Sequence, residues 1–188
     1  MSLISYNASR SFAIRSFATR HDPSHMAKVC YPAKGSAKLR VGRFSEPGRA
    51  YLVTFATAMR KPVFADWEAA SAAAIAFQSR TMLRSSRLLC WVLMPDHWHG
   101  LIELGDMDTL SSLVGRLKGA ITRALESRRD PTQKLWAEGF HDHGIRNDED
   151  ILEIARYIIR NPVRAKLVDR VGCYSFWDAV WIGEQHRD

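Results

Sequence analysis

The stretch that decides the fold is LLCWVLMPDHWHGLIEL, residues 88–104. Residues 88–94 are apolar on both faces, which is typical of a central strand. Pro95-Asp96 has the residue types of a tight turn, and residues 97–104 are expected to form the next strand. We therefore expect two antiparallel strands joined in a hairpin.

The segments on both sides of this hairpin supply the remaining elements. β-forming residues predict strands at 50–57 and, more briefly, at 140–146. Capping and turn residues predict three helices: from Asp66 to about Ser85, from Asp108 or Thr109 to near 129–131, and from near Asn147, with acidic residues at 148–150 in its first turn, to Asn161 before Pro162. This order indicates an α+β domain, an antiparallel sheet with helices packed on it.

The composition is that of a basic globular protein. The chain has 188 residues and a formal net charge of +7, a balance that attracts polyanions such as nucleic acids. No apolar run approaches the roughly 20 residues that span a bilayer, so no membrane segment is expected. Cys30, Cys90 and Cys173 form no CxxC pair, which disfavours a cysteine zinc site and indicates a reduced, cytoplasmic compartment.

Residues 1–39 show no clean hydrophobic period and carry scattered Ser, Lys and Arg. We expect a flexible basic arm here and one domain over residues 40–188. The first twenty residues hold three arginines and no acid, a composition that also fits an organelle transit peptide. We favour a simple extension, or an upstream start codon with Met26 as the true start.

The first chemical motif is His97-Trp98-His99. Because side chains alternate along a strand, both imidazoles lie on one face and Trp98 on the other, where it can enter the core. Two imidazoles two residues apart can converge on one metal ion. The alternative is a pair of polar side chains on the open face of a sheet.

The second motif is the helix that carries Tyr157 and Asn161. These residues are four apart, so their side chains lie on one helix face. If that face looks onto the histidine strand, it offers a hydroxyl and an amide oxygen to the same site. The alternative is a tyrosine half-buried between helix and sheet, with Asn161 capping the helix end.

A family resemblance links the two motifs. WVLMPDHWHGLIEL at 91–104, with YIIRNPVRAKLV at 157–168, resembles the REP-associated tyrosine transposases, single-tyrosine enzymes of the HUH class that are linked to repeated extragenic palindromes. Three further stretches agree: RVGRFSEPGRAYLVTFAT at 40–57, LSSLVGRLKGAITRAL at 110–125 and LWAEGFHDHGIRNDEDIL at 135–152. The resemblance implies a ferredoxin-like sheet.

The resemblance also implies roles for individual residues. His97 and His99 match the metal-binding pair, Tyr157 matches the nucleophile, and Asn161 falls where the family has a third, amide-bearing ligand. The implied reaction is metal-dependent cleavage and rejoining of single-stranded hairpin DNA through a 5′-phosphotyrosine. The expected metal is Mg²⁺ or Mn²⁺, and a monomer is expected, with a homodimer as the alternative. A second His-x-His at 141–143 is expected to contact DNA or to pack near the site, and metal ligation by it stays open.

DNA binding needs a basic surface, for which several residues are candidates: Arg116, Lys118 and Arg123 on the second helix, and Arg146, Arg160 and Arg164 near the tyrosine. For each of them a solvated surface charge is the alternative. Two rival functions also stay open, a non-catalytic DNA-binding protein of the same fold and a metal-dependent nuclease that uses water.

Overall fold

The structure is a computed structural model that describes residues 45–146 and 149–182. The expected basic arm over residues 1–39 and the expected domain start at Arg40 lie outside the described residues, as does the expected helix start at Asn147. Within the described ranges no helix combines the length and the apolar character needed to cross a membrane.

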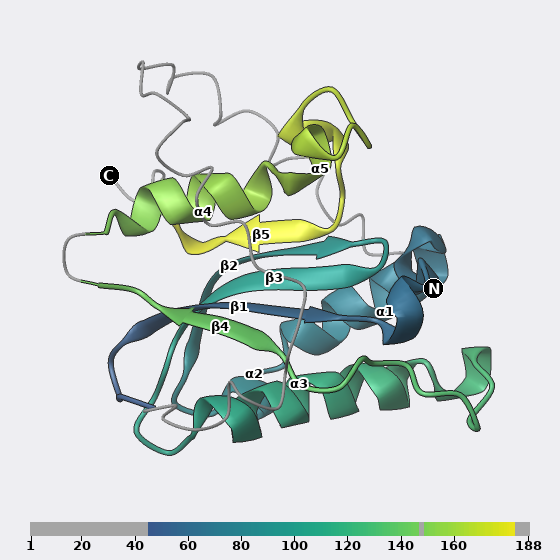
Figure 1. The fold of residues 1–188 in the computed structure, drawn as a ribbon, viewed down its shortest axis with the longest axis horizontal. Coiled ribbons are helices and arrows are strands. Elements are labelled where there is room, and N and C mark those ends of the chain that lie inside the picture. The colour runs from purple at the N-terminus through teal and green to yellow at the C-terminus, as the bar shows by residue number, and fades with distance from the viewer. Residues whose placement is uncertain (1–44, 147–148, 183–188) are drawn as a thin grey trace, which may run out of the picture.

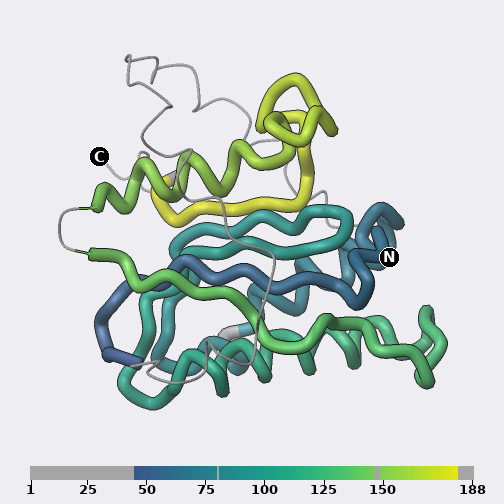
Figure 2. Tube along the Cα trace, viewed as in Figure 1, coloured from purple at the N-terminus to yellow at the C-terminus, as the bar shows by residue number. Residues whose placement is uncertain are grey.

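The hairpin at the centre of the chain forms as the sequence predicts. β2 (Arg87–Met94) pairs antiparallel with β3 (His97–Glu103), with Met94 opposite His97 and Val92 opposite His99. Only Pro95 and Asp96 separate the two strands, and the Cα trace shows the resulting tight turn (Figure 2). The hairpin fixes which side chains of β3 face each side of the sheet.

In the described part of the chain, five strands form one sheet in the order β4-β1-β3-β2-β5. β1 (Ala50–Ala56) lies between β3 and β4 (His141–Gly144), and all pairs are antiparallel. The first four strands have the ferredoxin-like order, so the predicted fold class is confirmed. β5 (Trp177–Ala179) extends the sheet beside β2 and was not predicted, because a strand of three residues is too short to show alternation.

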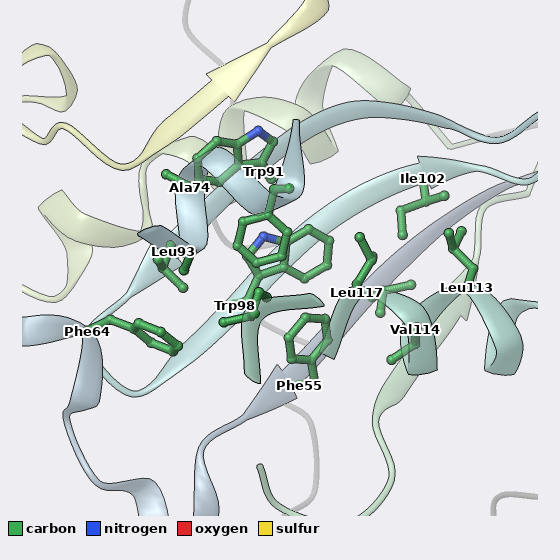
Figure 3. Packing of buried hydrophobic residues seen from close by; sticks show 14 of the residues in the cluster. Phe55, Phe64, Ala74, Trp91, Leu93, Trp98, Ile102, Leu113, Val114 and Leu117 are labelled. Atoms are coloured by element: carbon green, nitrogen blue, oxygen red, sulfur yellow. The ribbon is translucent and has the colours of Figure 1, made fainter. Parts of the chain in front are cut away.

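Helices cover both faces of this sheet (Figure 1). α1 (Trp67–Phe77) and α3 (Leu110–Ala124) pack on one face, and α4 (Ile151–Ile159) packs on the other. Trp98 is fully buried between the sheet and the first pair of helices, where it stacks with Phe55 (Figure 3). Its ring also stacks with Phe77. Its ring lies across Gly100, where any Cβ would come within 2.0 Å of the indole, so the glycine makes room for the tryptophan.

The helix predicted from Asp66 to about Ser85 is in fact two helices. Asp66 caps α1 by accepting from Ala69 N, as expected, but α1 ends at Phe77. Gln78 N donates to Ile75 O, and the Gln78 side-chain amide donates to Ala74 O. Both hydrogen bonds belong to the end of the helix. A separate short helix, α2 (Arg80–Leu83), follows. The prediction was wrong here because a local polar pair at 78–79 competes with the helical ladder.

Two other helix ends differ from the predictions. α3 stops at Ala124 rather than near 129–131, because Leu125 turns into the core and a tighter 3-10 turn follows. α4 begins only at Ile151, because Asp150 takes the N-cap and accepts from Leu152 N and Glu153 N. α4 ends at Ile159, and Pro162 lies in the first turn of α5 (Asn161–Arg164), where its missing N–H costs nothing. Short 3-10 turns complete the fold: Ala58–Arg60, Val63–Ala65, Glu126–Arg128, Val171–Cys173 and Val180–Ile182.

Candidate active site

The two histidines of β3 lie side by side on the face of the sheet that α4 covers. Their ring centroids are 4.7 Å apart and the rings are nearly perpendicular. Trp98, between them in sequence, points into the opposite core, as the strand alternation predicts. Because α4 packs on this face, the pair does not lie on an open sheet surface.

His97 is oriented by its neighbour in sequence. Asp96 Oδ1 lies 2.5 Å from His97 Nδ1. A carboxylate accepts, so Nδ1 carries the proton and Nε2 presents a lone pair. This is the carboxylate–histidine arrangement that commonly fixes the ring of a metal ligand.

His99 is oriented by the adjacent strand. Thr54 of β1 lies opposite His99 in the sheet register, and its Oγ1 is 2.7 Å from His99 Nδ1. This hydrogen bond uses Nδ1 and leaves Nε2 as the ring nitrogen that can bind a ligand. Both imidazoles therefore have one ring nitrogen engaged by the protein and one available.

The surroundings keep both imidazoles neutral. Burial lowers the pKa of His97, although the hydrogen bond and charge of Asp96 oppose the shift. Burial, together with the charges of His97, Arg60 and Arg164, lowers the pKa of His99 to about 3. Metal ligands must be deprotonated, so the pair is ready to bind a cation at neutral pH.

Tyr157 lies on α4, the helix that packs on the same face of the sheet as the histidine pair. Ile154, Ala155 and Ile158 bury one stripe of this helix against the sheet, which leaves Tyr157 half-buried beside that stripe. The Arg164 guanidinium carbon lies 4.3 Å from the Tyr157 ring centroid, and Arg164 belongs to α5, which begins directly after α4. The charge of Arg164 is also among the influences that lower the pKa of His99, after burial.

Asn161 has the capping contacts that the alternative interpretation predicts. Its Nδ2 donates to Ile158 O at 2.9 Å and to Tyr157 O at 3.2 Å, at the end of α4. Carbonyls only accept, so these contacts fix which end of the amide is nitrogen. The amide oxygen Oδ1 is the end left for a cation, so capping and ligation are compatible at this residue.

The donor set fits one divalent cation in an open site. Within residues 45–146 and 149–182, no group of three or more His, Cys, Asp or Glu side chains is placed to hold a metal ion. A site here would therefore use His97 Nε2 and His99 Nε2 with Asn161 Oδ1, and its remaining positions would take water or phosphate. Such mixed nitrogen and oxygen donors suit Mn²⁺ and also accept Mg²⁺.

Three residues of this site were not identified from the sequence. Asp96 and Thr54 orient the imidazoles, and Arg60 donates to Asp96 Oδ2 at 3.2 Å. Asp96 was interpreted only as a turn residue, although its position directly before the histidine could have indicated its role. Thr54 and Arg60 lie about forty residues earlier, so Thr54 is revealed only by the sheet register and Arg60 only by the loop after β1.

The second His-x-His contributes differently at its two positions. His141 lies opposite Thr54 in the register, so His99, Thr54 and His141 form one row across three strands. His143 Nε2 bonds both carboxylate oxygens of Glu149, at 2.9 and 3.1 Å. His143 therefore ties β4 to the start of α4, which is a packing role.

The basic residues predicted to bind DNA are not gathered on one surface. α3 and α4 lie on opposite faces of the sheet (Figure 1), which separates Arg116, Lys118 and Arg123 from Arg160 and Arg164. Two of the α3 residues are also engaged by the protein. Arg116 pairs with the buried Asp108 and donates to Met82 O.

Lys118 is the second of these α3 residues. It donates to Ala137 O and Gly139 O, at 3.0 and 2.5 Å. The exposed candidates that remain beside α4 are Arg146, Arg160 and Arg164.

Comparisons with known proteins agree with this geometry. The model of a family described as "Transposase IS200 like" matches residues 48–161, a range that contains both histidines and the tyrosine. A REP-associated tyrosine transposase of Escherichia coli K12 is 32% identical over 95 residues, 50% of this chain and 54% of that protein. An uncharacterized protein of Haemophilus influenzae is 26% identical over 95 residues, 39% of this chain and 52% of that protein. The chain thus spans about half the length of the curated relatives that it matches.

A solved structure extends the similarity to the fold. It is a REP-associated tyrosine transposase bound to a REP hairpin, with a TM-score of 0.59 and 25% sequence identity. The match covers 73% of this chain and 81% of that one. The resemblance inferred from the motifs is therefore confirmed by a family model, a relative and a structure.

Proposed function

Because the chain belongs to the IS200-like transposase family, we propose that it cuts and rejoins single-stranded DNA beside a hairpin, with Tyr157 as nucleophile. The observation that carries this proposal is that α4, the helix that carries Tyr157, packs on the same face of the sheet as the two imidazoles, with Arg164 over the Tyr157 ring. A phenol, a guanidinium and two neutral imidazoles would therefore serve one site. This combination suits attack on a phosphodiester.

The histidine pair and Asn161 would hold a divalent cation, Mg²⁺ or Mn²⁺. When bound, such an ion supplies positive charge that stabilises the extra negative charge of the phosphate in the transition state. The residues of the chain prepare this site in advance. Asp96 and Thr54 fix the two rings, and the end of α4 fixes the amide.

The proposed step transfers the DNA chain to the tyrosine. The Tyr157 hydroxyl loses its proton as its oxygen bonds to phosphorus, while the bond to the 3′ oxygen breaks and that oxygen gains a proton and leaves as a 3′-hydroxyl. The downstream DNA remains attached through a 5′-phosphotyrosine. Attack by a 3′-hydroxyl on this linkage reverses the step and reseals DNA without ATP, because the bond energy is kept.

The proposed substrate is a hairpin with single-stranded flanks. The solved relative is a transposase bound to a REP hairpin, and this chain has a formal net charge of +7. Arg146, Arg160 and Arg164 are exposed; Arg146 precedes α4, and Arg160 and Arg164 lie at its C-terminal end, where Arg164 contacts the tyrosine ring. Arginine binds phosphate with two parallel hydrogen bonds, so these residues would bind the DNA strand that enters the site. We propose that the monomer is the active unit.

The experiment incubates the full chain and Mn²⁺ with a labelled oligonucleotide that has a stable hairpin and single-stranded flanks. A denaturing gel separates the three functions left open by the sequence. A covalent protein–DNA band supports the tyrosine mechanism. Cleavage without that band would indicate a water-using nuclease, and binding without cleavage would indicate a non-catalytic protein.

A further inference from the structure

The loop after β1 has an unusual backbone beside the histidine pair. Met59 and Arg60 both have left-handed φ angles, 53° and 56°. Residues with a Cβ avoid this region, and such strain persists where the surrounding structure imposes it. Met59 and Arg60 are both exposed, so no burial of their own side chains accounts for the conformation.

Buried Thr57 holds this loop against the turn of the central hairpin. Thr57 N donates to Asp96 O at 2.9 Å, and its hydroxyl lies 2.9 Å from the same oxygen and 2.7 Å from Lys61 O. Arg60 N donates to Thr57 O at 3.2 Å. The loop and Asp96 therefore form one unit, and the strained backbone places the Arg60 side chain within it.

Arg60 is connected to the histidine pair through Asp96. Its Nη1 donates to Asp96 Oδ2 at 3.2 Å, and the other carboxylate oxygen contacts His97. One edge of the guanidinium is thus fixed, while the side chain is 60% exposed. A guanidinium has five N–H donors, so several remain for a ligand. Its charge acts on both imidazoles, as the charge of Arg164 acts on His99.

We propose that Arg60 is a further catalytic residue, which binds the non-bridging oxygens of the scissile phosphate while Asp96 holds its orientation. This inference rests on the proposed function. Arg60 and Arg164 come from segments far apart in the sequence, one bound to Asp96 and one over Tyr157, and would form a two-arginine phosphate site. Two parallel N–H donors match two phosphate oxygens, and they would stabilise the charge that builds up as Tyr157 attacks.

The test compares three variants of the full chain in single-turnover cleavage of the hairpin oligonucleotide. Arg60→Ala should lower the rate about 100-fold, the loss typical of one transition-state donor. Arg60→Lys keeps the positive charge but lacks the two parallel N–H donors of the guanidinium. Its rate should therefore lie between those of Arg60→Ala and the unmodified chain. Lys61→Gln is the matched control, because it removes an adjacent exposed charge whose amine donates to the exposed Gln133. Its rate should stay within about twofold of the unmodified chain.

Binding of Mn²⁺ without DNA separates phosphate contact from mere support of His97. Removing a positive charge beside the imidazoles should leave the Mn²⁺ affinity of Arg60→Ala equal to or tighter than that of the unmodified chain. The proposal is overturned if Arg60→Ala cuts as fast as Lys61→Gln, or if it binds Mn²⁺ weakly and saturating Mn²⁺ restores its rate. The second result would make Arg60 a positioning residue.

A measurement of DNA binding tests the phosphate contact of Arg60 independently of the proposed cleavage by Tyr157. In a Tyr157→Phe background, Arg60→Ala should reduce the slope of log affinity against log salt by about 0.7, one phosphate contact on a single strand, while Lys61→Gln should not. If the unmodified chain binds hairpin DNA without cutting it, the proposed chemistry is wrong. In that case the salt dependence of binding still tests whether Arg60 contacts a phosphate. An unchanged slope for Arg60→Ala would overturn that contact.

Discussion

The guanidinium of Arg164 lies over the ring of Tyr157, with its central carbon 4.3 Å from the ring centroid. Arg164 belongs to α5, which begins directly after α4. A cation over the ring restricts where the phenol can move and places a positive charge where a phosphate would approach. Arg164 would therefore support Tyr157, the proposed nucleophile, by position and by charge.

Arg164→Ala should lower the cleavage rate about 10- to 100-fold. Loss of an exposed cation–π contact should cost only about 0.5–1 kcal/mol of unfolding free energy. Arg87→Ala is the matched control, because Arg87 pairs with Glu103 at the far end of the hairpin from the histidines. Single-turnover rates and urea denaturation test both statements. Equal rates for the two variants would remove Arg164 from the active site.

Asp96→Asn should weaken Mn²⁺ binding about 10- to 100-fold, the usual cost of removing the carboxylate that orients a histidine ligand. The amide keeps the size of the side chain, and the backbone contacts of Asp96 with Thr57 remain. Calorimetric titration of Mn²⁺ measures the affinity, and circular dichroism checks the fold. An unchanged affinity with the fold intact would show that His97 does not bind the ion.

Lys118 provides a pH-dependent stability test far from the histidines. Burial lowers its pKa from 10.5 to about 8 in the folded chain. Between these values the unfolded chain binds more protons, so the free energy of unfolding should rise with pH. Lys118→Met should lack this rise. Urea denaturation from pH 7.5 to 10.5 measures it, and parallel profiles for both proteins would contradict the burial of the amine.

The same variant tests the DNA role predicted for Lys118 from the sequence. Its amine is committed to Ala137 O and Gly139 O. The affinity of Lys118→Met for hairpin DNA should therefore stay within about twofold of the unmodified chain, or ~0.4 kcal/mol. A larger loss, with the fold intact, would place α3 on the DNA.

The placement of the two histidines could be predicted because it depends on residues that are neighbours in the sequence. The order of His97, Trp98 and His99 fixes which face each side chain takes. The helix that was predicted to carry both Tyr157 and Asn161 ends at Ile159, and Asn161 lies in α5. Contacts between distant segments could not be predicted this way. The pairing of Thr54 with His99 depends on sheet register, and the contact of Arg60 with Asp96 depends on a strained loop.

The same distinction applies to the fold: elements with a strong local pattern were predicted, and those that depend on distant pairing were not. The strands of the hairpin were correct because their apolar pattern is strong. The helix predicted over 66–85 was wrong because Gln78 ends it with its own side chain. β5 was missed because its three residues become a strand only by pairing with β2.

Tyr174 is an alternative candidate for the nucleophile. Its hydroxyl donates to Leu93 O at 2.6 Å, and burial raises its pKa to about 12. Tyr174→Phe should therefore lower the free energy of unfolding by about 1 kcal/mol and leave the covalent adduct intact. Loss of the adduct in a folded Tyr174→Phe protein would move the nucleophile away from α4.

Mapping the covalent adduct tests the central claim most directly. The full chain, Mn²⁺ and hairpin DNA are incubated, the protein is digested, and the modified peptide is identified by mass spectrometry. The account predicts that the downstream DNA is attached to Tyr157. Tyr157→Phe should give no adduct and no free 3′-hydroxyl, while it binds the hairpin within about threefold of the unmodified chain, or ~0.65 kcal/mol. Cleavage that persists in Tyr157→Phe, or an adduct on another residue, would contradict it.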